Sequence, residues 1–97
     1  MILELVDLRI QPGQNTAFEA ALRHGVECFI RPSPGCLGYT IHHGLESPER
    51  YVLQIRWNTL EDHTLGFRQS EAFGHWRATL GPFFASAPLV EHFQALE

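Results

Sequence analysis

The sequence lacks lysine altogether, has only two cysteines, and contains no apolar run near the roughly 20 residues that a membrane-spanning helix needs. Its seven basic residues are all arginines, scattered along a chain with a formal net charge of −4. Nucleic acids and anionic lipid surfaces both attract clustered positive charge. We therefore expect neither a nucleic-acid partner nor association with a membrane.

The two cysteines are Cys28 and Cys36. The N-terminal stretch MILELVDLRI has no basic segment followed by a long apolar run, so we expect no secretory signal. Without export to an oxidising compartment, two reduced thiols are favoured over a disulfide across the short intervening loop. These features predict a cytoplasmic protein.

With 97 residues, of which 44% are apolar, the chain is expected to form one domain over residues 1–97. Alternation of apolar residues predicts four strands, at residues 2–10, 36–43, 51–57 and 89–96. In the second strand, the side chains expected on one shared face are Leu37, Tyr39, Ile41 and His43.

Helical spacing is found between these strands. Apolar residues at intervals of four and three predict a first helix whose buried stripe consists of Phe18, Leu22, Val26 and Phe29. Residues 57–84 hold both tryptophans and predict two more helices, broken near Gly66. Their expected N-terminal caps are Thr59, with Asp62 three residues later, and Ser70.

The order strand, helix, strand, strand, helix, helix, strand is typical of the ferredoxin-like split β-α-β fold, an α+β architecture. Such a fold has one antiparallel sheet with its helices on a single face. Apolar side chains are present on both faces of the predicted strands, and a large exposed apolar face is unusual for a monomer. We therefore expect a homodimer packed through the open sheet face.

Several stretches together resemble the antibiotic biosynthesis monooxygenase (ABM) domain family. They are the first strand followed by Pro12-Gly13 and a helix with Phe18, and the segments PGCLGY (34–39), YVLQIRW (51–57) and SEAFGHW (70–76). This resemblance implies a dimeric α+β barrel with a cavity between sheet and helices in each subunit. Characterised members of the family oxidise electron-rich aromatic substrates with O2 without flavin, haem or metal; others degrade haem, and many have no known activity.

The resemblance also bears on which branch of the family applies. Haem-degrading relatives use an asparagine on the first strand, a tryptophan at the helix junction and a histidine on the next helix. The corresponding positions here are Val6 or Asp7, Phe67, and Trp76 or Arg77, with His75 one step away. Haem degradation is therefore disfavoured. Cofactor-free relatives line their cavity with asparagine, tryptophan, tyrosine and arginine, for which the nearest residues are Trp57, Tyr39 and Arg68.

His63 lies on the apolar side of the first of the two later helices. It is either a histidine hydrogen-bonded within the core or a neutral imidazole that faces a cavity and accepts a phenolic proton. Its ordinary pKa of roughly 6.5 suits a base near neutrality, and burial lowers that pKa. Because cofactor-free oxygenation starts from a substrate anion that gives an electron to O2, we expect His63 to be the catalytic base.

Five further residues are candidates for substrate binding. Trp57, Phe67 and Trp76 either fill the core or form walls for a flat aromatic molecule. The Tyr39 hydroxyl can orient a substrate carbonyl, and Arg68 is either solvated or a clamp for an oxyanion. The five histidines other than His63 show no i, i+4 ligand spacing backed by a carboxylate, so we expect no metal site, and the family resemblance implies that no cofactor is needed.

The family resemblance, taken with these candidate residues, implies a homodimeric, cofactor-independent monooxygenase that oxidises a small hydroxylated aromatic or quinol with O2. The alternative is a non-catalytic, ligand-binding or stress-associated dimer that uses the same cavity. A haem-degrading monooxygenase is a third, disfavoured function.

Overall fold

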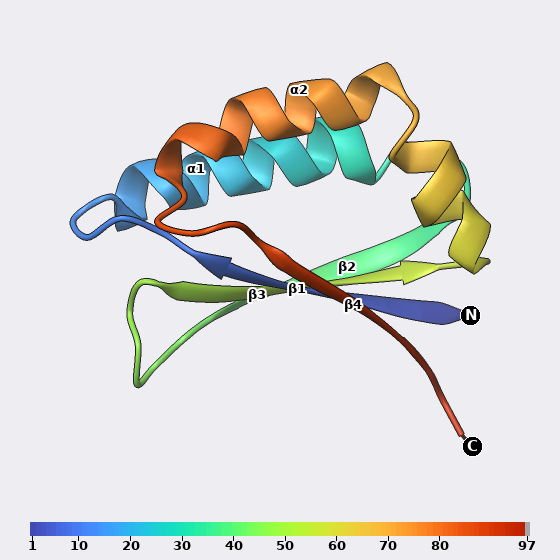
Figure 1. Cartoon of the computed structure of the whole chain (residues 1–97), viewed down its shortest axis with the longest axis horizontal. Helices are drawn as coiled ribbons and strands as arrows, with labels where there is room; N and C mark the ends of the chain where they lie inside the picture. Colours follow the sequence, from blue (N-terminus) through green and yellow to red (C-terminus); the bar gives the residue numbers. More distant parts are fainter. Residues whose placement is uncertain (97) are drawn as a thin grey trace.

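Figure 1 shows the computed structural model of the chain, in which residues 1–96 are described. Its four strands are β1 (Ile2–Arg9), β2 (Cys36–His43), β3 (Arg50–Trp57) and β4 (Leu89–Gln94). They form one antiparallel sheet in the order β2-β3-β1-β4. The helices α1 (Asn15–Gly25) and α2 (Glu71–Leu80) lie beside one another on the same face of this sheet (Figure 1). The predicted ferredoxin-like α+β fold is confirmed.

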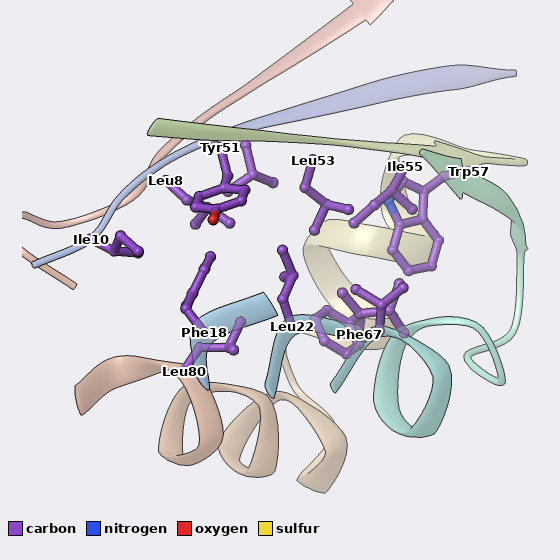
Figure 2. Close-up of a cluster of buried hydrophobic side chains, with 13 residues drawn as sticks. Leu8, Ile10, Phe18, Leu22, Tyr51, Leu53, Ile55, Trp57, Phe67 and Leu80 are labelled. Carbon is purple, nitrogen blue, oxygen red and sulfur yellow. The ribbon is translucent and has the colours of Figure 1, made fainter. Parts of the chain in front are cut away.

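The core lies between this sheet face and the two helices. Alternation along β1 and β3 turns every second side chain toward the helices, and these side chains meet Phe18 and Leu22 of α1 and Leu80 of α2 (Figure 2). The Phe18 and Tyr51 rings pack with their centres 4.9 Å apart. Burying a large apolar side chain stabilises a fold by roughly 1.5–3 kcal/mol. This interface therefore holds the helices against the sheet and fixes the position of any site between them.

Two π-helical turns change which side chains face the core. Helix α1 continues into η1 (Val26–Ile30), where the Arg31 N–H donates to the Val26 carbonyl over 2.8 Å, an i to i−5 bond. Because a π turn contains an extra residue, Ile30 moves into the core with 1% of its surface exposed, while Phe29 is only half-buried. The predicted stripe is confirmed at its first three positions and wrong at Phe29.

The predicted face of β2 needs a similar correction. Tyr39 and Ile41 pack against the core, whereas Leu37 is 55% exposed. The pairing register of β2 with β3 shifts between Cys36 and Gly38, and this bulge reverses the alternation at the start of the strand. Gly38 has a φ of 152°, a conformation that favours glycine.

The second helical region begins with the expected capping box. The Thr59 N–H donates to Asp62 Oδ2 over 3.0 Å, and the Asp62 N–H donates to Thr59 Oγ1 over 3.2 Å. The segment η2 (Asp62–Phe67) is a second π-helical stretch that includes Gly66, so the break between helices comes later than predicted. Ser70 occupies the N-cap position of α2, as expected, although its hydroxyl donates to the Phe67 carbonyl instead of capping the helix.

Two further features concern the chain as a whole. The thiols of Cys28 and Cys36 are both free, the first exposed and the second half-buried. Within residues 1–96, no helix combines the length and apolarity needed to cross a bilayer. A short 3-10 turn, η3 (Gly81–Phe83), connects α2 to the segment that leads into β4.

Candidate active site

A cavity of about 970 Å³ lies between the inner face of the sheet and the helical segments η2 and α2. This volume is at the upper end of the range for small-molecule sites. Most of the lining is apolar, and the charged or titratable side chains among the described lining residues are Glu4, His63, Arg68 and Arg77. A cavity of this kind suits a flat apolar ligand that is oriented by a small number of polar groups.

Glu4 is the acidic group of this lining. It occupies an inward position on β1, where it is 4% exposed. The Trp57 indole N–H donates to Glu4 Oε1 over 2.8 Å, and Glu4 Oε2 lies 3.3 Å from His63 Nε2. A buried carboxylate is costly unless neighbouring groups compensate it, and these two contacts supply that compensation.

His63 is held between two aromatic rings and two polar partners. Its ring stacks on Trp57 with centres 5.5 Å apart and on Phe67 with centres 6.2 Å apart. His63 Nδ1 lies 2.8 Å from His92 Nε2, which comes from the inward face of β4. With Nε2 directed at Glu4 and Nδ1 at His92, both ring nitrogens already have a protein partner.

Burial acts on the two titratable groups in opposite senses. It raises the pKa of Glu4 to about 7, although the hydrogen bond from Trp57 and the positive charge of Arg68 both lower it. Burial lowers the pKa of His63 to about 4, assisted by the charges of Arg68 and His92. Near pH 7, therefore, His63 is neutral while Glu4 exchanges readily between its two protonation states.

A neutral His63 can serve either state of Glu4. When Glu4 is ionised, the His63 proton sits on Nε2 facing the carboxylate, and Nδ1 accepts from His92. When Glu4 is protonated, it donates to His63 Nε2; the His63 proton is then on Nδ1 and is donated to His92 Nε2, with the His92 proton on the other ring nitrogen. The three side chains thus form a linear chain with His63 in the middle. Within residues 1–96, no group of three or more His, Cys, Asp or Glu side chains is arranged to hold a metal ion.

The structure brings together most of the residues predicted as site residues. His63, Phe67, Arg68 and Trp76 all line the cavity. Trp57 is fully buried behind it, where it contacts Glu4 and stacks on His63. Trp57 therefore supports the site from within the core and does not form one of its walls.

Tyr39 lies elsewhere. Its hydroxyl donates to the Glu27 carboxylate, and the ring borders a separate, smaller hollow that also includes Arg31, Cys36 and Arg56. The β2 strand is at one edge of the sheet, two strands away from Glu4 on β1. The Tyr39 hydroxyl is therefore not among the polar groups of the large cavity.

Sequence reasoning missed two residues of the site, Glu4 and His92. The signal for Glu4 was present, because it is a charged residue at an inward position of a strand that otherwise turns Val6, Leu8 and Ile10 toward the core. His92 alternates with Val90 on β4, but that strand is weakly patterned. Its partner His63 lies 29 residues earlier in the chain, so their contact depends on the tertiary fold.

Comparison with known proteins agrees with this architecture. Residues 1–79 match the family model described as antibiotic biosynthesis monooxygenase. The uncharacterized protein YczJ of Bacillus subtilis (strain 168) is 37% identical over 94 residues, covering 97% of this chain and 98% of YczJ.

Solved structures give the same assignment. A candidate antibiotic biosynthesis monooxygenase from Bordetella bronchiseptica is 38% identical, with a TM-score of 0.91 over 99% of this chain and 97% of that one. A candidate of the same description from Nitrosomonas europaea has a TM-score of 0.83 over all of both chains; at 24% identity it supports the fold alone. The chain therefore belongs to the antibiotic biosynthesis monooxygenase family.

Proposed function

We propose that this protein is a cofactor-independent monooxygenase that oxidises a hydroxylated aromatic or a quinol with O2, with Glu4 and His63 as its proton-accepting pair. The observation that carries this proposal is a carboxyl group with a pKa of about 7 in the lining of an apolar cavity, beside an arginine. A base is most effective when its pKa is close to the working pH.

The pKa values favour Glu4 over His63 as the group that finally holds the proton. A phenol has a pKa of roughly 10, so its proton moves to His63, with a pKa of about 4, at a cost of about 8 kcal/mol. Transfer to Glu4, with a pKa of about 7, costs only about 4 kcal/mol. His63 then has the role of a neutral partner that shifts its own proton between Nε2 and Nδ1 as Glu4 changes state.

The reaction balances without a further reductant. Glu4 takes the phenolic proton, the resulting phenolate gives one electron to O2, and the two radicals combine to form a C–O bond at a ring carbon that bears hydrogen. Glu4 returns its proton to the peroxide, then takes the proton of that carbon as the O–O bond breaks. The departing hydroxide receives this proton and becomes water. One oxygen atom is thus in the product carbonyl and the other is in water.

Arg68 and the apolar walls contribute in different ways. The guanidinium group of Arg68 lines the cavity and stabilises the phenolate as it forms, which lowers the cost of the first proton transfer. Phe67 and Trp76 offer ring faces to a flat substrate. Arg68 itself is exposed, so solvent partly screens its interaction with the oxyanion.

A non-catalytic ligand-binding protein is the second candidate. This function is favoured because both ring nitrogens of His63 already have protein partners, Glu4 and His92, as they would in a purely structural hydrogen-bond network. The same two contacts disfavour haem binding, because His63 is the imidazole of the described cavity lining and has no free nitrogen for iron.

We also propose that the protein works as a cytoplasmic homodimer. Its two free thiols are consistent with a reducing compartment. The sheet face opposite the helices carries apolar residues, among them Leu89 with 67% of its surface exposed and Phe93 with 46% exposed. A second copy of the chain would cover this face.

Oxygen uptake tests the proposed reaction. Purified protein, with no added cofactor, should consume O2 when supplied with 1-naphthol or with naphthoquinols, and 18O2 should place one labelled atom in the product and one in water. The variant Glu4→Gln should lose activity, while Glu46→Gln, in the exposed β2–β3 turn, should retain it. Tight binding of these compounds without O2 uptake would establish the ligand-binding function instead.

A further inference from the structure

The charge of the cavity differs in sign from that of the whole protein. The chain is acidic, with a formal net charge of −4, yet the charged side chains among the described lining residues are two arginines, Arg68 and Arg77, and one carboxyl, Glu4. Since the pKa of Glu4 is about 7, this carboxyl offsets at most one of the two positive charges near neutral pH. The cavity is therefore a positive site within an acidic protein.

Neither arginine forms an ion pair with the described part of the chain. By contrast, three other arginines do form ion pairs: Arg9 and Arg50 with Asp7, and Arg31 with Glu27. Arg68 acts at longer range: its charge lowers the pKa values of Glu4, His63 and His92. Its guanidinium donors remain available to a ligand.

Arg77 is positioned by an aromatic ring. Its guanidinium carbon lies 5.7 Å from the centre of the Phe73 ring, four residues earlier on α2, as expected for a helical side chain that points toward the N-terminus. Phe73 in turn packs edge-on against Phe67, with ring centres 5.6 Å apart. Arg77 is thus held over the aromatic wall of the cavity, away from Glu4 on the sheet.

The two arginines lie at separate places along this wall. Arg68 precedes α2 and Arg77 is in its second half, about 9 Å along the helix axis from Glu71 at the start of α2, given the 1.5 Å rise per helical residue. Gly74, which lies between them in the chain, lines the cavity without a side chain, and Ala78, one residue beyond Arg77, adds only a methyl group. One flat molecule can therefore lie along α2 and reach both arginines.

We propose that the substrate carries a fixed anionic group, such as a carboxylate, remote from its reacting hydroxyl, and that Arg77 binds this group while Arg68 faces the hydroxyl. This inference rests on the proposed function for the identity of the reacting end. Arginine is well suited to carboxylate recognition because its planar group donates two parallel hydrogen bonds. A neutral quinol would use only one of the two cations.

Binding measured without O2 tests this inference separately from turnover. Calorimetric titration should show that 6-hydroxy-2-naphthoate binds about tenfold or more tightly than 6-hydroxy-2-naphthamide, which has the same shape without the charge. Arg77→Gln should abolish this preference and leave the affinity for the amide unchanged. The matched control Arg23→Gln, an exposed arginine of α1 outside the cavity lining, should bind both compounds like the unmodified protein.

The outcomes separate the two proposals. Equal affinity for the acid and the amide, or equal behaviour of Arg77→Gln and Arg23→Gln, would overturn the anionic-substrate inference even if O2 uptake with neutral quinols is observed. Preferential binding of the acid with no oxidation of any hydroxylated aromatic would remove the proposed reaction and leave the anion site intact. The preference should also weaken with added salt, because it is electrostatic.

Discussion

At the residue scale, Glu4 and His63 share one buried location but respond to pH in opposite directions. The folded protein holds the Glu4 proton more tightly than the unfolded chain does, since the pKa rises from 4.5 to about 7. The associated stability is fully present below pH 4.5 and is lost as the pH rises through about 7. The pKa of His63 falls from 6.5 to about 4, so its burial weakens the fold at low pH and stability returns as the pH rises toward 6.5.

We therefore predict that the two effects, each about 3 kcal/mol, nearly cancel between about pH 4.5 and 6.5. Substituting either residue removes its own pH-dependent contribution to stability, so the contribution of the other residue is no longer cancelled. Relative to the unmodified protein, Glu4→Gln should gain stability as the pH rises from 4.5 to 7. His63→Gln should lose relative stability as the pH rises from 4 to 6.5. Urea unfolding at a series of pH values measures both slopes.

The exposed residue Thr40 of β2 provides the control for this experiment, because Thr40→Ala removes no titratable group and should give no such slope relative to the unmodified protein. If the free energies of unfolding of the Glu4 and His63 variants differ from that of the unmodified protein by the same amount at every pH, the two groups do not have the pKa shifts assigned to them.

Catalysis gives a second prediction for Glu4. If its carboxylate is the base, the rate of O2 uptake at limiting substrate, which reports kcat/KM, should rise with pH and level off above about 7, because the ionised form accumulates through its pKa. Glu4→Gln should lower that rate by a factor of about 100 or more. The remaining activity should lack this rise. If the rate of O2 uptake still rises with pH in Glu4→Gln, the titrating group is a different residue.

At the scale of elements, α2 contains a residue of low helix propensity, Gly74, in its interior. Gly74 is exposed in the helix interior, and a Cβ built there meets no atom within 4 Å. Gly74→Ala should therefore stabilise the protein by about 1 kcal/mol through helix propensity alone. Because Gly74 lines the cavity, the larger Gly74→Leu should also stabilise the helix but should weaken the binding of 6-hydroxy-2-naphthoate.

Urea unfolding and calorimetric titration separate these two effects. Ala20→Gly, at an exposed position of α1 away from the cavity, should cost about 1 kcal/mol and leave binding unchanged. Gly74→Leu with undiminished affinity would show that the ligand does not lie along this face of α2.

The sequence predicted elements well where the signal is local. The alternation in β1 and β3 and the Thr59–Asp62 capping box depend on residues only a few positions apart, and all are present in the structure. The errors at Phe29 and Leu37 follow from a π turn and a β-bulge. Each inserts one residue into a regular period, and the packing of Ile30 into the core favours the first of these insertions. Periodicity alone cannot locate such insertions.

The site was only partly predictable for a related reason. His63, Phe67, Arg68 and Trp76 come from one stretch of sequence, and all line the cavity. Glu4 joins them only because β1 is a central strand between β3 and β4. The environment of His63 depends on that pairing, since Glu4 lies 59 positions before it.

At the scale of the whole molecule, the sheet face opposite the helices determines the expected assembly. Leu3 and Leu5 of β1 are half-buried even in the single chain. On the neighbouring β4, Phe93 pairs with Leu3 and Leu89 lies further along the same strand face, and both of these side chains are exposed. Apolar residues gathered on one face favour association with a second copy through a twofold axis. We predict that light scattering at micromolar concentration gives twice the chain mass of 11.0 kDa.

Substitutions on this face should reverse the association. Phe93→Glu would place two carboxylates near each other across the twofold axis, or bury one without a partner, so the dimer should dissociate. Leu65→Glu changes a similarly exposed apolar residue, 54% exposed against 46% for Phe93, on the helical side and should leave the dimer intact. The melting temperature of the unmodified protein should rise with concentration, because dimerisation stabilises the folded chain by mass action, and Phe93→Glu should lose this dependence. A stable monomer, or dissociation by Leu65→Glu but not by Phe93→Glu, would place the interface elsewhere.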